Sequence, residues 1–126
     1  MDSFKYALAG LFVMFKEERN ARIHLIMAIG SIVGGVYFNL SLTEWIFLVF
    51  AIGLVIALEL INTAIENLAD FVSPERNEKI KKVKDLAAGA VLVGAMGAFI
   101  IGLIIFLPKL LNIYEIIFNF PSLIDF

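Results

Sequence analysis

Three acids and one amide share a helical face in the segment ELINTAIENLAD, residues 59–70. They are Glu59, Asn62, Glu66 and Asp70. At about 100° per residue these side chains fall within one narrow stripe of an α-helix. Carboxylates can accept protons as general bases, and they bind hard divalent cations through oxygen. The segment therefore predicts a helix with a chemically active face.

The depth of Glu59 sets this face apart from a solvated one. The uncharged residues 45–58 lead into it without a break, and Trp45 is typical of a membrane interface. At about 1.5 Å per residue, Glu59 lies about 21 Å beyond Trp45, within a hydrocarbon core about 30 Å thick. Ionisable residues at such depth mark substrate or ion paths. From the residues alone, an enzyme, an ion or proton transporter, and plain salt bridging all remain open.

The composition indicates a membrane protein of a single domain. Of 126 residues, 61% are hydrophobic. Cysteine is absent from the sequence, so there is no disulfide framework, thiolate metal site or cysteine nucleophile. Charged residues interrupt the apolar positions near the N-terminus, which excludes the layout of a signal peptide and predicts that this segment stays on the mature protein.

The hydropathy pattern predicts an all-α membrane protein. Residues 2–22 read as an amphipathic helix lying on the membrane surface. Three transmembrane helices are expected at residues 23–40, 44–71 and 83–107. Residues 1–110 then form the membrane domain, and residues 111–126 form a C-terminal tail at the interface.

Basic residues predict the orientation in the membrane. Four Lys and Arg lie in residues 5–22 and five in residues 76–84, nine of the ten in the chain. Cytoplasmic loops carry this excess, so the N-terminus and the 76–84 loop are expected in the cytoplasm. Ala90, Gly94, Ala98 and Gly102 recur at every fourth position and suit close helix packing. Because three helices bury little of a carboxylate stripe, several copies are expected to associate.

The charged groups at the inner interface suit phosphoryl transfer. Glu18 and Glu66 are candidates for binding Mg²⁺. Lys81, Lys82 and Lys84 are placed to bind a polyphosphate, while the deeper Glu59 meets the hydroxyl of a lipid. The sequence has neither a P-loop nor a protein-kinase motif, so an ATP site would be of another kind. His24 is interpreted as an interface residue.

These segments resemble a known family. ELINTAIENLAD, with KDLAAGAVLV beginning fourteen residues after Asp70, is similar to the signature of the small integral-membrane prokaryotic diacylglycerol kinases. The likeness covers about residues 4–110, including GLFVMFKEERNARIH and IIGLIIFLPKL. It implies a homotrimer of three-span protomers that uses ATP and Mg²⁺ to phosphorylate a lipid hydroxyl at the cytoplasmic face of the bacterial inner (plasma) membrane, with membrane lipids as partners and no nucleic acid.

The resemblance also implies roles for individual residues. Glu59 corresponds to the catalytic base, with Asn62 beside it, and Glu18 and Glu66 correspond to the metal-binding acids. Expected nucleotide contacts are Tyr6, Glu18, Glu66, Glu75, Arg76, Asn77, Lys84 and Asp85. The stretches ERNARIH and GLIIFLPKL resemble the Gram-positive members that phosphorylate undecaprenol. Undecaprenol is therefore the expected substrate, and diacylglycerol is the alternative.

Overall fold

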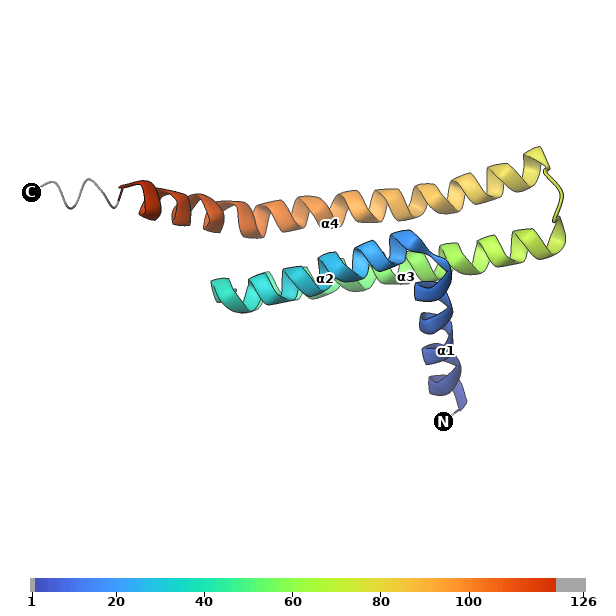
Figure 1. Cartoon of the computed structure of the whole chain (residues 1–126), viewed down its shortest axis with the longest axis horizontal. Helices are drawn as coiled ribbons and strands as arrows, with labels where there is room; N and C mark the ends of the chain where they lie inside the picture. Colours follow the sequence, from blue (N-terminus) through green and yellow to red (C-terminus); the bar gives the residue numbers. More distant parts are fainter. Residues whose placement is uncertain (1, 120–126) are drawn as a thin grey trace, which may run out of the picture.

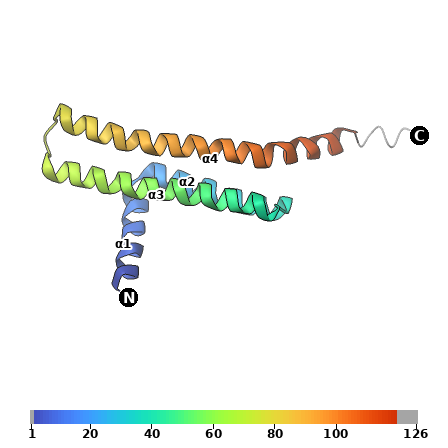
Figure 2. The same ribbon diagram turned by 180° about the vertical axis from the view of Figure 1, so that it is seen from behind.

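A computed structural model describes residues 2–119, and within them the chain forms four helices. They are α1 (Asp2–Glu17), α2 (Arg19–Phe38), α3 (Leu42–Val72) and α4 (Glu78–Asn119). Figure 1 shows α2, α3 and α4 running along the long axis, while α1 leaves this bundle crosswise. The view from behind shows α3 extended alongside α4 (Figure 2). The predicted all-α class is confirmed.

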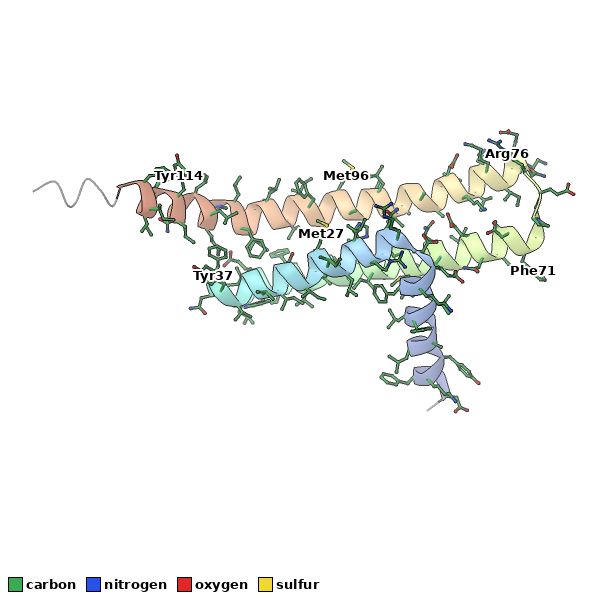
Figure 3. All side chains as sticks on the ribbon, in the orientation of Figure 1. Met27, Tyr37, Phe71, Arg76, Met96 and Tyr114 are labelled. Carbon is green, nitrogen blue, oxygen red and sulfur yellow. The ribbon has the colours of Figure 1, made fainter. Side chains whose placement is uncertain are left out.

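Three of these helices are long and apolar enough to cross a membrane. Over an 18-residue window of each helix, the mean hydropathy is 1.5 in α2, 2.4 in α3 and 2.8 in α4. Large apolar side chains such as Met96 point outward along their length (Figure 3), and Met96 is exposed in the single chain. Such a surface needs lipid or another protein chain to cover it. The prediction of three transmembrane helices is confirmed at this level.

The boundary between the first two helices differs from the prediction. Residues 2–22 were expected to form one helix, but Glu18 adopts an extended backbone (φ −105°, ψ 114°) and separates α1 from α2. The Arg22 guanidinium donates to the carbonyls of Phe15 and Lys16 at 3.2 and 3.1 Å. These carbonyls lie in the last turn of α1, where helical partners are missing. Arg22 therefore stabilises the break, and the span begins at Arg19 instead of residue 23.

A tight turn joins α2 to α3. Asn39 ends α2 in the left-handed conformation (φ 58°, ψ 58°), which asparagine tolerates better than most residues. Ser41 then caps α3: its hydroxyl accepts from the amide of Glu44, and the Glu44 carboxylate accepts from the amide of Ser41. Ser41 is thus the N-cap of α3, which begins two residues before the expected residue 44.

The last helix is longer than the predicted 83–107 at both ends. It begins in the polar segment at Glu78, where the Asn77 side chain accepts from the amide of Lys79 at 2.8 Å. It also continues through Pro108, so residues 111–119 of the expected tail are helical. Proline removes one backbone hydrogen bond but does not end α4 here. Residues 120–126 of the tail lie outside the described residues.

Small residues let the helices approach closely. A Cβ at Gly94 of α4 would overlap the side chain of Leu58 on α3, which confirms a close approach at one position of the small-residue ladder. Gly34 of α2 lies against the ring of Phe106, since a Cβ there would be 3.4 Å from Cε1. At Gly35 a Cβ would meet Trp45 at 2.7 Å. The turn end of the bundle, at residues 39–41, is thus tightly packed.

Ion pairs join α3 and α4 near both ends of the bundle. At the turn end, Lys109 pairs with Glu44. At the loop end, next to residues 73–77, Lys84 pairs with Asp70. The two helices are therefore held in one register along their shared length.

Candidate active site

A buried polar cluster lies on α3. Glu59 is 2% exposed and Asn62 is 8% exposed, and Thr63 is buried with them. These residues are three and four positions apart, so they lie on one face of the helix. The Thr63 hydroxyl donates to the backbone carbonyl of Glu59 at 2.8 Å and not to the Glu59 carboxylate. Glu59 is thus buried among the side chains of its own chain.

His24 of α2 lies against this carboxylate. Its Nδ1 is 2.9 Å from Oε1 of Glu59, and its side chain is 21% exposed. The two atoms are within ion-pair distance, yet they are not aligned as a hydrogen bond, and both are buried without such a partner. The interpretation of His24 as an interface residue missed this contact. The available sequence signal was that the only histidine begins the first span, at the membrane level expected for Glu59.

Asn62 adds a further unpaired group. Its Oδ1 is buried and has no hydrogen-bond partner among the described residues. Buried polar atoms are nearly always paired, so an unpaired one needs an explanation. Oδ1 of Asn62, beside the Glu59 carboxylate, gives this region spare hydrogen-bonding capacity. Such capacity suits a site that receives a polar substrate group.

A second group of acidic side chains includes Glu18. It lies in the break between α1 and α2, and burial raises the pKa of its carboxyl, with further increases from the negative charges of Glu66 and then Glu59. The structure therefore brings the two predicted metal-binding acids into electrostatic contact. A divalent cation relieves repulsion between neighbouring carboxylates. Glu18 and Glu66 thus have the chemistry to bind Mg²⁺.

A magnesium ion at this pair would need further oxygen ligands. Within residues 2–119, no three His, Asp or Glu side chains are grouped closely enough to hold a metal ion by themselves. Mg²⁺ commonly keeps water and binds substrate phosphates beside one or two carboxylates. The pair therefore fits a metal that arrives with a phosphate-bearing substrate.

A hydrogen bond that was not predicted from the sequence joins α3 to the end of α1, next to the break at Glu18. The Asn67 amide of α3 donates to Oε2 of Glu17 at 3.0 Å and to the carbonyl of Thr63 at 2.8 Å. Glu17 is the last residue of α1 and directly precedes Glu18. This contact ties the end of α1 to the acidic face of α3. Sequence periodicity placed Asn67 on α3 but could not identify its partner on another helix.

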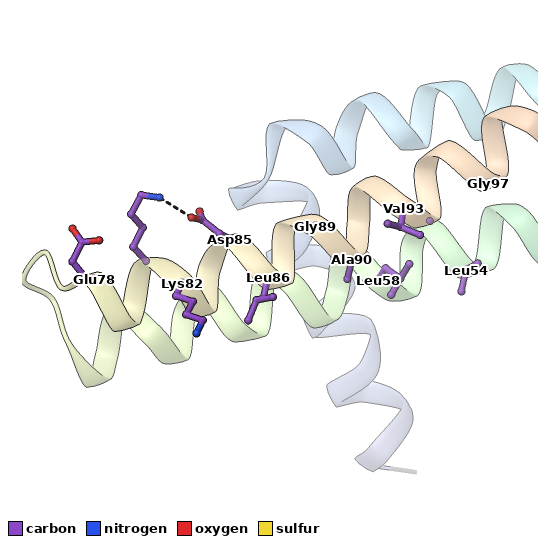
Figure 4. A pocket seen from close by; sticks show the side chains of 12 residues that line it. Leu54, Leu58, Glu78, Lys82, Asp85, Leu86, Gly89, Ala90, Val93 and Gly97 are labelled. Carbon is purple, nitrogen blue, oxygen red and sulfur yellow. Dashed lines mark hydrogen bonds and ion pairs between the residues drawn. The ribbon is translucent and has the colours of Figure 1, made fainter.

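Charged residues at the start of α4 border a wide groove. The groove has a volume of about 920 Å³, with Lys81, Lys82 and Asp85 at one end and Gly94 and Gly97 further along. Figure 4 shows its lining on α3 and α4, including the ion pair between Lys81 and Asp85 at 2.7 Å. Of the predicted nucleotide contacts, Lys84 is engaged with Asp70, and Asp85 is exposed beside the groove.

The remaining predicted contacts lie apart within one chain. Tyr6 is 71% exposed on α1, the helix that projects from the bundle. Glu75, Arg76 and Asn77 form the α3–α4 loop, and Figure 3 shows Arg76 at the loop end, away from α1. One chain therefore does not bring Tyr6 to this loop, and their shared role in nucleotide binding stays a prediction.

Comparisons with known proteins identify relatives that cover most of the helical region. The family model described as prokaryotic diacylglycerol kinase matches residues 5–106. An undecaprenol kinase of Bacillus subtilis is 42% identical over 86% of this chain and 88% of its own. A diacylglycerol kinase of Synechocystis is 39% identical over 88% of this chain and 64% of its own. A diacylglycerol kinase of Helicobacter pylori is 37% identical over 77% of each.

Proposed function

Because the chain belongs to the prokaryotic diacylglycerol kinase family, and is thus a membrane lipid kinase that transfers a phosphoryl group to an alcohol, we propose that its acceptor is undecaprenol and its donor is ATP with Mg²⁺. The observation that carries this proposal is the buried Glu59 carboxylate, which lies beside unpaired polar atoms within a transmembrane helix. The hydroxyl of a lipid is a polar group that can reach Glu59, because the chain attached to it is apolar.

Glu59 is the general base in the proposed reaction. The lipid hydroxyl transfers its proton to the Glu59 carboxylate while its oxygen bonds to the γ-phosphorus of ATP. The bond from that phosphorus to the bridging oxygen breaks, and ADP leaves with the electron pair. Asn62, one turn along the same face, holds the hydroxyl in line by donating an N–H of its side-chain amide to the hydroxyl oxygen.

Glu18 and Glu66 hold the magnesium ion in this proposal. Mg²⁺ neutralises phosphate charge as the γ-phosphoryl group is transferred. The repulsion that raises the pKa of Glu18 supports this role, because bound Mg²⁺ would offset it. Lys84 and Asp85 contact the nucleotide at the start of α4, together with Tyr6 and the loop residues Glu75, Arg76 and Asn77.

A homotrimer is the proposed assembly. The single chain exposes long apolar helix faces and leaves Tyr6 distant from the loop, so a second copy would supply nucleotide contacts that one chain separates. The N-terminus and the active site lie on the cytoplasmic side, because the basic segments 5–22 and 76–84 flank the spans there. Water-soluble ATP then reaches the groove beside Lys81 and Lys82.

Undecaprenol is preferred over diacylglycerol on the similarity to the Bacillus relative. Diacylglycerol remains the second candidate, because the Synechocystis and Helicobacter relatives are named diacylglycerol kinases. Their identities to this chain are nearly as high as that of the Bacillus relative. Both lipids present one hydroxyl at the interface, so the chemistry of the base does not separate them.

Phosphoryl transfer from labelled ATP tests the proposal directly. Purified protein in mixed micelles with Mg²⁺ receives undecaprenol and diacylglycerol, separately and in competition, with the Glu59→Gln protein as the control. Label in undecaprenyl phosphate is expected. Label mainly in phosphatidic acid would make diacylglycerol the substrate and leave the proposed mechanism unchanged. Label in neither lipid contradicts both, and proton or cation flux in sealed vesicles without ATP would then favour transport.

A further inference from the structure

The contact between His24 and Glu59 is not used by the proposed reaction. His24 is the only histidine in the sequence, and its Nδ1 lies 2.9 Å from Oε1 of Glu59. Among residues 2–119, no other cationic side chain is paired with this carboxylate. A buried carboxylate without a partner is strongly disfavoured. The contact with His24 therefore gives the buried Glu59 carboxylate a polar partner.

The fold holds His24 in this place. The Arg22 guanidinium binds the end of α1, and α2 begins at Arg19, directly after the break at Glu18 and five residues before His24. Ala21 and Ala28, on either side of His24 along α2, are both buried against the rest of the chain. His24 also stands at one end of a cavity of about 250 Å³ whose other lining is almost entirely apolar. A polar ring in that setting has few other partners.

The geometry points to a positioning role, and we propose that His24 holds the Glu59 carboxylate in the orientation required for proton abstraction. In the tautomer with hydrogen on Nδ1, a rotation of the ring brings the N–H onto Oε1. Oε2 of the same carboxylate then remains available for the proton of the lipid hydroxyl. This inference rests on the proposed role of Glu59 as the base, and His24 itself does not contact the reacting phosphorus.

Three substitutions separate this role from simple packing. In His24→Asn the amide nitrogen occupies the place of Nδ1, so the contact with Oε1 can be kept. In His24→Gln the amide lies further out, near the place of Nε2, so the contact is lost while polarity is kept. In His24→Leu both the contact and the polarity are lost. Ser31→Ala is the matched control, because Ser31 lines the same cavity on α2 and bonds only to the carbonyl of Met27.

The kinetic constants give the decisive comparison. A displaced catalytic group costs roughly 10- to 100-fold in rate, so kcat should fall by about that factor in His24→Gln and His24→Leu. The KM for ATP should not change, because the nucleotide contacts lie elsewhere. His24→Asn should keep kcat within about threefold of the parent. Ser31→Ala should match the parent in both constants.

Other outcomes overturn the inference. Equal activity in all three His24 variants would show that the contact is not needed. Equal loss in all three, including Asn, would show that the placement of Nδ1 is not what matters. If His24→Leu fails to fold, the comparison between Asn and Gln still decides, because both are polar amides.

A combined variant distinguishes this inference from the proposed function. In a Glu59→Gln background, His24→Gln should cause no further loss, because a residue that acts through Glu59 has nothing left to position. Additive losses would contradict the inference while leaving Glu59 as the base. Near-normal turnover in Glu59→Gln alone would instead remove the proposed base, whatever the His24 variants show.

Discussion

Glu59 is the residue on which turnover should depend most. Glu59→Gln keeps the size and most of the polarity of the side chain but removes the proton acceptor. We expect kcat to fall by about 10²- to 10⁴-fold, while Mg-ATP binding is nearly unchanged. Phosphate-transfer assays and calorimetric titration with Mg-ATP measure the two effects. Glu115→Gln, an exposed acid on α4, is the control and should behave as the parent. A near-normal rate in Glu59→Gln contradicts the assignment.

Glu18 should oppose folding until a metal is bound. Its pKa is higher in the folded chain than its ordinary value of 4.5, so the folded state holds the proton more tightly. The ionised group therefore destabilises the fold above the raised pKa, and this effect fades as pH falls and is absent below 4.5. Glu18→Gln should raise the unfolding temperature of metal-free protein at pH 7, and the gain should shrink in acid.

The same Glu18 variant should need more Mg²⁺ for activity. Loss of one carboxylate removes a ligand from the proposed pair, while Glu66 remains. A Mg²⁺ titration of activity at fixed ATP measures this requirement. A variant that is less stable than the parent at pH 7, or that shows an unchanged Mg²⁺ titration, contradicts the assignment of Glu18.

At the residue scale, sequence periodicity predicted the acidic face but not its neighbours. The spacing of Glu59, Asn62 and Glu66 on one helix is fixed by the geometry of that helix alone. The contacts of His24 with Glu59, and of Asn67 with Glu17, join different helices. A pattern along one helix does not identify the residue that faces it from another, so these two contacts required the structure.

At the scale of elements, the close approach of α3 and α4 should depend on Gly94. Gly94→Leu forces a side chain into the space of Leu58, and overpacking of this kind typically costs about 1–3 kcal/mol. Gly97→Leu is the control, because a Cβ there meets no atom within 4 Å. Thermal unfolding in detergent should show a clear decrease for Gly94→Leu alone. Equal decreases in both variants would contradict the packing argument.

The end of α4 should be dispensable for turnover. Figure 1 shows α4 continuing past the turn end of the bundle, and Lys109 pairs with Glu44 at that end. A chain that stops after Lys109 should therefore keep its kcat and its KM for ATP. Loss of activity would make residues beyond Lys109 part of the site or of the assembly. Activity of this shortened chain beside the full chain is the measurement.

The helices themselves were predicted well, and their ends less well. Ser41 and Glu44 form a capping box, which is a local signal, and the predicted start of α3 at residue 44 was only two residues late. The break at Glu18 has no such signal, because it depends on the long contact from Arg22 back to α1. The predicted end of the last helix at residue 107 was too early, because α4 continues through Pro108. Local signals were reliable where the cause was local.

At the scale of the whole molecule, a site shared between copies predicts complementation. Lys84 pairs with Asp70, which lies eleven residues beyond Glu59, or about 16 Å along α3 at 1.5 Å per residue. A trimer can bring Lys84 of one copy near Glu59 of another. Chains carrying Glu59→Gln and chains carrying Lys84→Ala should then regain activity when assembled together. Mixtures no more active than their parents would indicate a site built within one chain.

The distance between the two ion pairs that join α3 and α4 can be compared with the thickness of a bilayer. Glu44 and Asp70 are 26 residues apart on α3, about 39 Å at 1.5 Å per residue, and Lys84 and Lys109 are 25 residues apart, about 38 Å. A bilayer with its headgroup regions is about 40–45 Å thick. In a bilayer crossed by both helices, one ion pair would lie near each water-facing boundary, so their separation can serve as a gauge of membrane thickness. Bilayers much thinner or thicker than this gauge would draw one pair out of the headgroup region.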